Sequence, residues 1–148
     1  MAKGAKFLHK DINVYSILGD GELAEGQIWE ATMFAAHYQL DNLCIIVDLN
    51  GLQIDGTIDE VNSAMPLADK FRAFKWHVIE LADGNDMAQI EAAFAEEVTG
   101  APVAIIAETV KGKGVSFMEN QVGWHGKAPN DEQFEQAMAE LAAAGEEL

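Results

Sequence analysis

The sequence is poor in cysteine and in basic residues, and it has no long apolar run. Its 148 residues include one cysteine, Cys44, which excludes an intrachain disulfide and is typical of a reducing cytoplasm. The chain has 9 Lys and Arg residues and 25 Asp and Glu residues, which gives a net charge of −16. This charge argues against nucleic acids and anionic membranes as partners, because both bind positively charged surfaces. No stretch approaches the roughly 20 apolar residues of a membrane-spanning helix. We therefore expect a cytoplasmic protein that binds neither nucleic acid nor membrane.

The remaining composition is typical of one globular domain. Apolar residues make up 49% of the chain, and a chain of this length can bury a substantial core. No internal repeat or low-complexity linker divides it, and no secretory signal opens it. We expect a single domain over residues 1–148.

Two stretches rich in Gly and Asp form the clearest pattern, and each follows a short apolar run. Residues 14–18 (VYSIL) lead into GDGELAEG at 19–26, and residues 43–47 (LCIIV) lead into DLNGLQIDG at 48–56. Both runs are rich in β-branched residues and too short for helices, which indicates buried strands. Residues 27–40 between them have helical spacing. Strand, helix and strand in this order form a βαβ unit with parallel strands.

The same alternation continues to the C-terminus. The patterns predict strands over 75–81 and 103–108, helices over 66–74, 87–98 and from 131 onward, and loops over 50–62 and 109–126. Asn130, with Gln133 three residues later, marks the start of the last helix. Residues 1–13 are poorly patterned, and we expect them to fray. The chain is therefore predicted to be a three-layer α/β domain, with an open, mainly parallel sheet of about four strands and helices on both faces.

Asp20 and Asn50 are the candidate metal ligands. They lie thirty residues apart, each just past the end of a predicted strand, and ligands of open parallel sheets bind outside those ends. A carboxylate, an amide oxygen and a neighbouring main-chain carbonyl would suit Mg2+ or Ca2+ rather than zinc. Such a cation keeps positions for phosphate oxygens, and Gly19 and Gly21 let the backbone approach an anion. The alternative for Asn50 is turn chemistry alone, which asparagine also favours.

These stretches resemble the diphosphate-binding motif of thiamine diphosphate enzymes and, more closely, that of transketolases. The transketolase family carries GDG-x-x-x-EG and, downstream, D-x-N-x-x-x-IDG, and both patterns occur here at 19–26 and 48–56. The resemblance extends from about Gly4 to the C-terminus. It includes the stretches LDNL at 40–43, TVKGKG at 109–114 and GWHGKAP at 123–129.

The resemblance implies roles for residues within these motifs. The metal, Mg2+ or Ca2+, would be held by Asp20, Asn50 and the main-chain carbonyl of Leu52. His125 would face the diphosphate and the substrate as the catalytic residue, and Glu25 would lie at an interface between subunits. Ile54 would pack on the cofactor rings. The whole set in contact with thiamine diphosphate would be Gly19, Asp20, Gly21, Glu22, Asn50, Leu52 and Ile54.

The resemblance also implies an activity, the transfer of a two-carbon ketol unit between sugar phosphates. The family's segment before the GDG strand and its pyrimidine-binding domain have no counterpart in this sequence. We therefore expect the diphosphate-binding half of a split transketolase, truncated at its N-terminus, which is inactive alone and needs a pyrimidine-domain subunit. Apolar surface left uncovered would favour a homo-oligomer. One alternative stays open, a non-catalytic binding remnant of this domain. Another thiamine diphosphate family, such as a 2-oxo acid dehydrogenase or a deoxyxylulose phosphate synthase, is a further alternative, but the stretches QIDG at 53–56 and WHGK at 124–127 favour transketolase over both.

Overall fold

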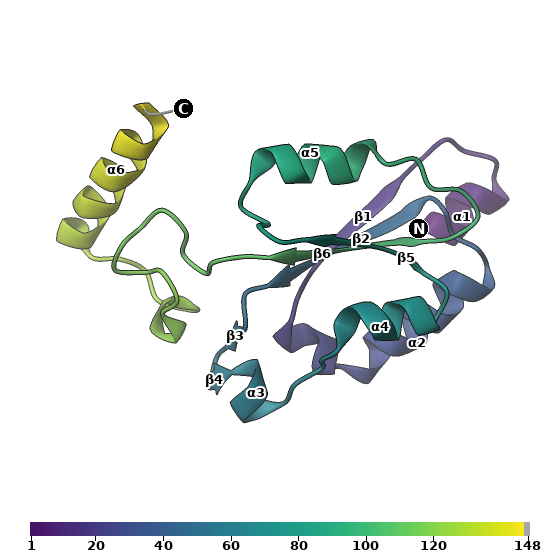
Figure 1. Cartoon of the computed structure of the whole chain (residues 1–148), viewed down its shortest axis with the longest axis horizontal. Helices are drawn as coiled ribbons and strands as arrows, with labels where there is room; N and C mark the ends of the chain where they lie inside the picture. The colour runs from purple at the N-terminus through teal and green to yellow at the C-terminus, as the bar shows by residue number, and fades with distance from the viewer. Residues whose placement is uncertain (147–148) are drawn as a thin grey trace.

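A computed structural model describes residues 1–146 and places a four-stranded parallel sheet at the centre of the molecule (Figure 1). The strands lie in the order β1 (Val14–Gly19), β2 (Leu43–Leu49), β6 (Val103–Glu108) and β5 (His77–Leu81). The prediction of an α/β fold with a parallel sheet is confirmed. The last strand of the chain, β6, lies between β2 and β5, so the sheet order differs from the chain order.

Helices cover both faces of the sheet, as predicted. Helices α2 (Gly26–His37) and α4 (Leu67–Ala73) lie on one face, and α5 (Met87–Ala95) lies on the other (Figure 1). This arrangement follows from βαβ connections, which place each crossover helix against the sheet. Among residues 1–146, none of the helices combines the length and the apolarity needed to cross a membrane.

The main core lies between the sheet and helices α2 and α4. Phe71 of α4 and Val47 of β2 are both 0% exposed, and Trp76 is buried beside them. Trp29 of α2 packs on Phe71 with 5.4 Å between ring centroids, and the Trp76 indole donates to the Thr32 carbonyl at 3.0 Å. These contacts hold α2 and α4 against the sheet. Because the loops at the carboxyl ends of the strands lead into these helices, the same packing holds the loops in place.

The α5 face of the sheet is only partly covered. A smaller core joins α5 to β5 and β6 through Leu81, Ala93 and Ile105. On the edge strand β1, however, Tyr15 is 56% exposed and Ile17 is 74% exposed. An apolar strip of β1 therefore lies open along this face.

The N-terminal residues form a helix rather than a frayed segment. Helix α1 (Ala2–Phe7) is tied to the turn between α2 and β2: the Asn42 side chain donates to the Ala2 carbonyl at 3.1 Å. Lys6 pairs with Asp41 at 2.8 Å in the same turn. The expectation that residues 1–13 fray is wrong for these residues, because their partners lie some 40 residues away in the chain, where no local pattern reveals them.

The predicted loop over 50–62 contains regular structure. Strands β3 (Leu52–Gln53) and β4 (Gly56–Thr57) pair as a short antiparallel hairpin, and α3 (Ile58–Val61) follows directly. Thr57 and Glu60 form a complete capping box at the start of α3. The prediction of a plain loop is wrong here, although T-x-x-E at 57–60 is a signature of a helix start.

The remaining differences are at element ends. Helix α2 ends at His37 rather than at residue 40, because the chain folds back and the Leu40 N–H donates to the Ala35 carbonyl at 3.1 Å. Helix α5 ends at Ala95 rather than at residue 98, and β5 begins two residues late, at His77. Strand, helix and loop types are otherwise as predicted.

The C-terminal helix α6 (Asp131–Glu146) extends beyond the carboxyl edge of the sheet, away from the other helices (Figure 1). Its predicted start is confirmed: the Gln133 N–H donates to Asn130 Oδ1 at 2.9 Å, and the Asn130 N–H donates to Gln133 Oε1 at 3.1 Å. Ser116 donates from its N–H and its hydroxyl to Glu140, at 2.6 and 2.7 Å, which holds α6 to the preceding loop.

Candidate functional site

Asp20 joins the ends of β1 and β2. It directly follows β1 and caps a short 3-10 helix, η1 (Gly21–Ala24), where its Oδ1 accepts the Gly21 N–H at 2.8 Å. Its Oδ2 accepts the Gly51 N–H at 2.5 Å, across 31 residues of sequence. The side chain is only 3% exposed. One buried carboxylate therefore connects the two loop tips that the sequence predicted to meet.

Asn50 and Leu52 lie on the second of these loops. Asn50 Oδ1 accepts the Leu52 N–H at 3.1 Å, which forms a tight turn between β2 and β3. Gly51 lies between them with φ +75, a conformation that favours glycine. This turn directs the loop back toward Asp20, so the two predicted ligand side chains line one cavity.

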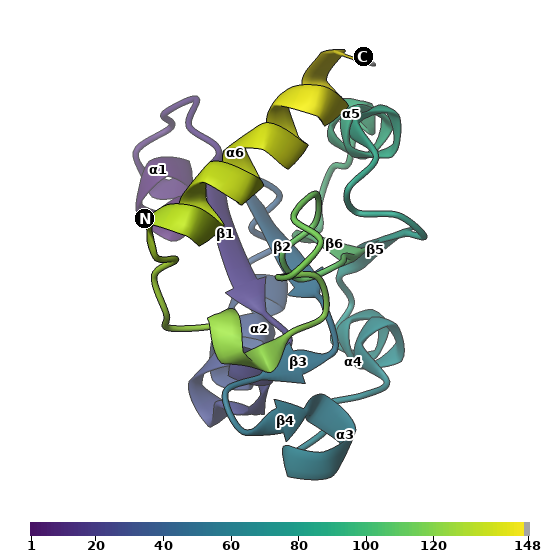
Figure 2. The same cartoon turned by 90° about the vertical axis from the view of Figure 1, so that its left-hand side faces the viewer.

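That cavity has a volume of about 450 Å³ and lies at the carboxyl edge of the sheet. Figure 2 faces this edge and shows β3, β4 and α3 beside the ends of β1 and β2. The side chains and backbone that line the cavity are Gly19, Asp20, Gly21, Glu22, Asp48, Asn50, Leu52, Gln53, Ile54, Asp55, Lys111 and His125.

All the predicted cofactor and catalytic residues line this one cavity. His125 reaches it from 105 residues beyond Asp20, and Lys111, a cation near the end of β6, lines it too. Glu25 does not: it lies exposed at the start of α2, and its side chain makes no cap hydrogen bond. Its interface role stays a prediction. The cavity residues outside the predicted cofactor and catalytic set are Asp48, Gln53, Asp55 and Lys111.

The electrostatics of the cavity favour a cation. Burial raises the pKa of Asp20, and the neighbouring Asp48 carboxylate raises it further, although the Gly51 and Gly21 N–H groups oppose this. Asp48 itself accepts a hydrogen bond from the Thr109 hydroxyl. A cation beside Asp20 would stabilise its ionised form. Within residues 1–146, no three His, Cys, Asp or Glu side chains cluster as a metal site, so such a cation would need amide and main-chain oxygens.

The long loop after β6 folds back on itself next to the cavity. The Asn120 N–H donates to the Lys111 carbonyl at 2.9 Å and closes the loop. Gly112 has φ +74, and a Cβ there would lie 2.7 Å from the Met118 carbonyl oxygen, so only glycine fits. Trp124 donates to the Phe117 carbonyl at 3.0 Å, just before His125. This packing fixes the position from which Lys111 and His125 line the cavity.

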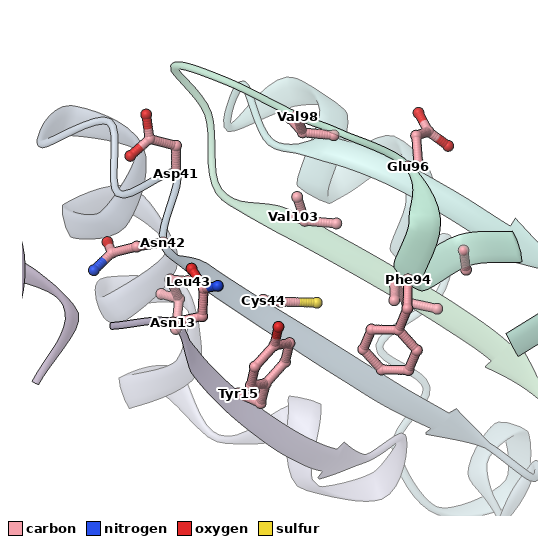
Figure 3. A pocket seen from close by; sticks show the side chains of 12 residues that line it. Asn13, Tyr15, Asp41, Asn42, Leu43, Cys44, Phe94, Glu96, Val98 and Val103 are labelled. Atoms are coloured by element: carbon pink, nitrogen blue, oxygen red, sulfur yellow. The ribbon is translucent and has the colours of Figure 1, made fainter. Parts of the chain in front are cut away.

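A second cavity, of about 190 Å³, lies at the opposite, amino-terminal edge of the sheet (Figure 3). Tyr15, Cys44 and Phe94 face it from β1, β2 and α5. Burial raises the pKa of the Cys44 thiol to about 11, so little reactive thiolate is present near neutral pH. None of the predicted site residues lines this cavity.

The fold and the site define a parallel α/β domain with a polar cavity at the carboxyl edge of its sheet. Residues 3–147 match the family described as the transketolase thiamine diphosphate-binding domain. The chain belongs to this family.

Relatives and solved structures are transketolases. The chain is 43% identical over 147 residues to the 6-deoxy-6-sulfo-D-fructose transketolase subunit SqwG of Clostridium sp. (strain MSTE9), covering 98% of this chain and 53% of that protein. It is 42% identical over 150 residues to an apulose-4-phosphate transketolase subunit of Phocaeicola vulgatus, covering 100% and 53%. The transketolase of Campylobacter jejuni superposes with a TM-score of 0.85 at 28% identity, over 95% of this chain and 23% of that chain. The chain thus spans about half the length of the first two relatives.

Proposed function

We propose that this chain is the diphosphate-binding half of a transketolase-like enzyme, which binds thiamine diphosphate through a divalent cation. With a pyrimidine-domain partner it transfers a two-carbon ketol unit between sugar phosphates. The observation behind this proposal is the meeting of two loop tips: Asp20 accepts the Gly51 N–H at 2.5 Å, next to Asn50, in a cavity at the carboxyl edge.

The residues present fit Mg2+, with Ca2+ as the alternative. Asp20 is a buried carboxylate, and burial disfavours its negative charge. A cation bound beside it would stabilise that charge. Asn50 and the main-chain carbonyl of Leu52 would add two neutral oxygens, and Mg2+ leaves further positions to phosphate oxygens. Thiamine diphosphate supplies the carbanion chemistry when bound. The role of this half is to hold and orient it.

Other cavity residues would shape the diphosphate and ring subsites. Gly21 would lie against the diphosphate, and Glu22 supports the turn by accepting the Gly19 N–H at 3.3 Å. Ile54 lines the cavity from the hairpin tip and is 68% exposed, which suits an apolar side chain that packs on cofactor rings. His125 would donate hydrogen bonds or move a proton on the substrate side.

The substrates would be anionic sugars. The two relatives above are named for a sugar phosphate and for a sulfonated sugar. Lys111 lines the cavity at the end of β6 and would serve as a point charge for an anionic group. The lone cysteine also fits the cytoplasm, where such sugar phosphates would be handled.

The partner would be a pyrimidine-domain subunit, because several relatives are named as subunits of a transketolase. Its glutamate would activate the cofactor ring. A second copy of the chain would associate through exposed apolar groups such as Tyr15, Ile17 and Phe34, with Glu25 at an interface between subunits.

Calorimetry and complementation test this function. We expect thiamine diphosphate to bind the chain only with Mg2+ present, and we expect Asp20→Ala to abolish the binding. Mixing the chain with a pyrimidine-domain subunit should restore ketol transfer from a sugar phosphate donor. Binding without any transfer would favour the non-catalytic alternative, and no binding at any Mg2+ concentration would contradict the proposal.

A further inference from the structure

Gln53 lines the cavity, and the proposed function leaves it without a role. It lies on β3, paired with Gly56 across the hairpin. Its side chain rests on the GDG turn: a Cβ on Gly21 would lie 3.0 Å from Gln53 Cβ and 3.3 Å from Gln53 Oε1. The absence of a side chain at Gly21 therefore makes room for the Gln53 carboxamide at the cavity wall.

The amino group of this carboxamide has no partner among the described residues. Gln53 Nε2 is buried and forms no hydrogen bond with any residue in 1–146. A buried donor without an acceptor is costly to folding, and such groups are rare in native structures. Gln53 lines the same cavity as Asp20 and Asn50, so a turn of its carboxamide toward the cavity would offer this donor to an acceptor that is not part of the described chain.

The charge of the cavity points to the nature of that acceptor. Four lining residues are carboxylic acids: Glu22, Asp20, Asp48 and Asp55. Lys111 is the cation among the lining residues, so an anion entering the cavity needs additional donors. A neutral amide N–H provides one without a second positive charge, and the terminal torsion of glutamine turns easily toward a ligand.

We propose that Gln53 is a diphosphate-binding residue, whose Nε2 donates a hydrogen bond to an anionic oxygen held beside the Asp20–Asn50 cation. This inference rests on the proposed function, since it requires the diphosphate to occupy this cavity. It predicts a contact that the motif residues Asp20, Asn50 and Leu52 do not supply: they hold the cation, whereas Gln53 contacts the anion directly.

Calorimetry on Gln53→Leu tests the inference, with the magnesium complex of inorganic diphosphate as the first probe and thiamine diphosphate as the second. We expect both affinities to fall by about tenfold to a hundredfold, the effect of losing one hydrogen bond to a charged acceptor. Without ligand, the variant should unfold at the same or a higher urea concentration than the wild type, because leucine removes an unpaired donor. A merely structural glutamine would lower that concentration and leave both affinities unchanged.

Two further variants sharpen the result. Gln53→Glu keeps the size but replaces the donor with a carboxylate, so it should weaken both probes at least as much as leucine does. Gln121→Leu makes the same change at an exposed glutamine that forms no side-chain cap bond and does not line the cavity, so wild-type affinities are expected. Wild-type binding by both Gln53 variants would overturn the inference alone. Absence of binding by the wild-type chain would overturn the proposed function and this inference together.

Discussion

Replacing Asp20 with asparagine removes one charge and one acceptor from the point where two loops meet. The Gly21 N–H and the Gly51 N–H donate to different oxygens of this carboxylate, at 2.8 and 2.5 Å. In asparagine one of these oxygens becomes an NH2 group, so one backbone N–H loses its acceptor, at a cost of about 1–3 kcal/mol. Relief from burying a charge offsets part of this cost, because burial raises the pKa of Asp20. We expect the free energy of unfolding without metal to fall by about 1 kcal/mol.

The pH dependence has a defined sign. The folded-state pKa of Asp20 lies above the ordinary value of 3.8, so near this pH the folded chain binds more protons than the unfolded chain. The contribution of Asp20 to stability is therefore fully present below pH 3.8 and is lost as the pH rises through the raised pKa. Urea denaturation with a chelator present measures this fall in the free energy of unfolding with rising pH, and Asp20→Asn should not show it. Asp11→Asn, at an exposed carboxylate before β1, should retain it.

Adding Mg2+ and thiamine diphosphate should reverse the cost of the Asp20 charge at neutral pH. A ligand at 100 times its Kd stabilises the folded state by about 2.7 kcal/mol, which urea denaturation resolves easily. We expect this gain in the wild type and in Asp11→Asn, and none in Asp20→Asn. An equal gain in Asp20→Asn would refute the reasoning, because the cation would then be held without this carboxylate.

Three further predictions concern other parts of the fold. Phe71→Ala should lower the free energy of unfolding by about 3–5 kcal/mol, since its ring is 0% exposed in the main core; a loss under about 1 kcal/mol in urea denaturation would contradict that packing. Gly112→Ala should open the loop after β6, because residue 112 has φ +74 and the new Cβ would lie 2.7 Å from the Met118 carbonyl oxygen. Trypsin should then cleave faster at the adjacent lysines, and an unchanged rate would count against this packing. Cys44, with its pKa raised to about 11, should react with a thiol reagent at pH 8 far more slowly when folded than when denatured in urea, and equal rates would show that the thiol is not protected.

Much of the fold follows from local pattern. The runs that became β1, β2 and β6 are short and mostly apolar, as is typical of strands in a parallel sheet, and this pattern located them to within two residues. The β3–β4 hairpin and α3 were missed, because their elements are only two to four residues long and their stability depends on a capping box and on contacts outside the segment. Helix α1 was missed for the same reason, since its partner Asn42 is remote in sequence.

The unpredicted cavity residues show where the sequence stops being informative. Asp48 and Asp55 belong to the family motif at 48–56, but their residue types by themselves indicate only a turn. Gln53 lies within the family motif at 48–56, but its residue type assigns it no contact there. Its significance comes from the unpaired Nε2 and the contact with Gly21, which exist only in the folded chain. Lys111 enters the cavity because the loop after β6 folds back, and no periodicity predicts that path; His125, on the same loop, was indicated by the family motif and not by periodicity.

The sequence by itself determined that Asp20 and Asn50 come together. Parallel strands of one sheet end at one edge, and β1 and β2, joined by one helix, are neighbours in that sheet, so the residues that directly follow them lie near each other. Only the tertiary structure decided that β6 lies between β2 and β5, and that the loop after β6 folds back and brings Lys111 to the same edge. The physical reason is that strand order and loop path depend on contacts between segments far apart in the chain, and a local pattern of residues does not record them.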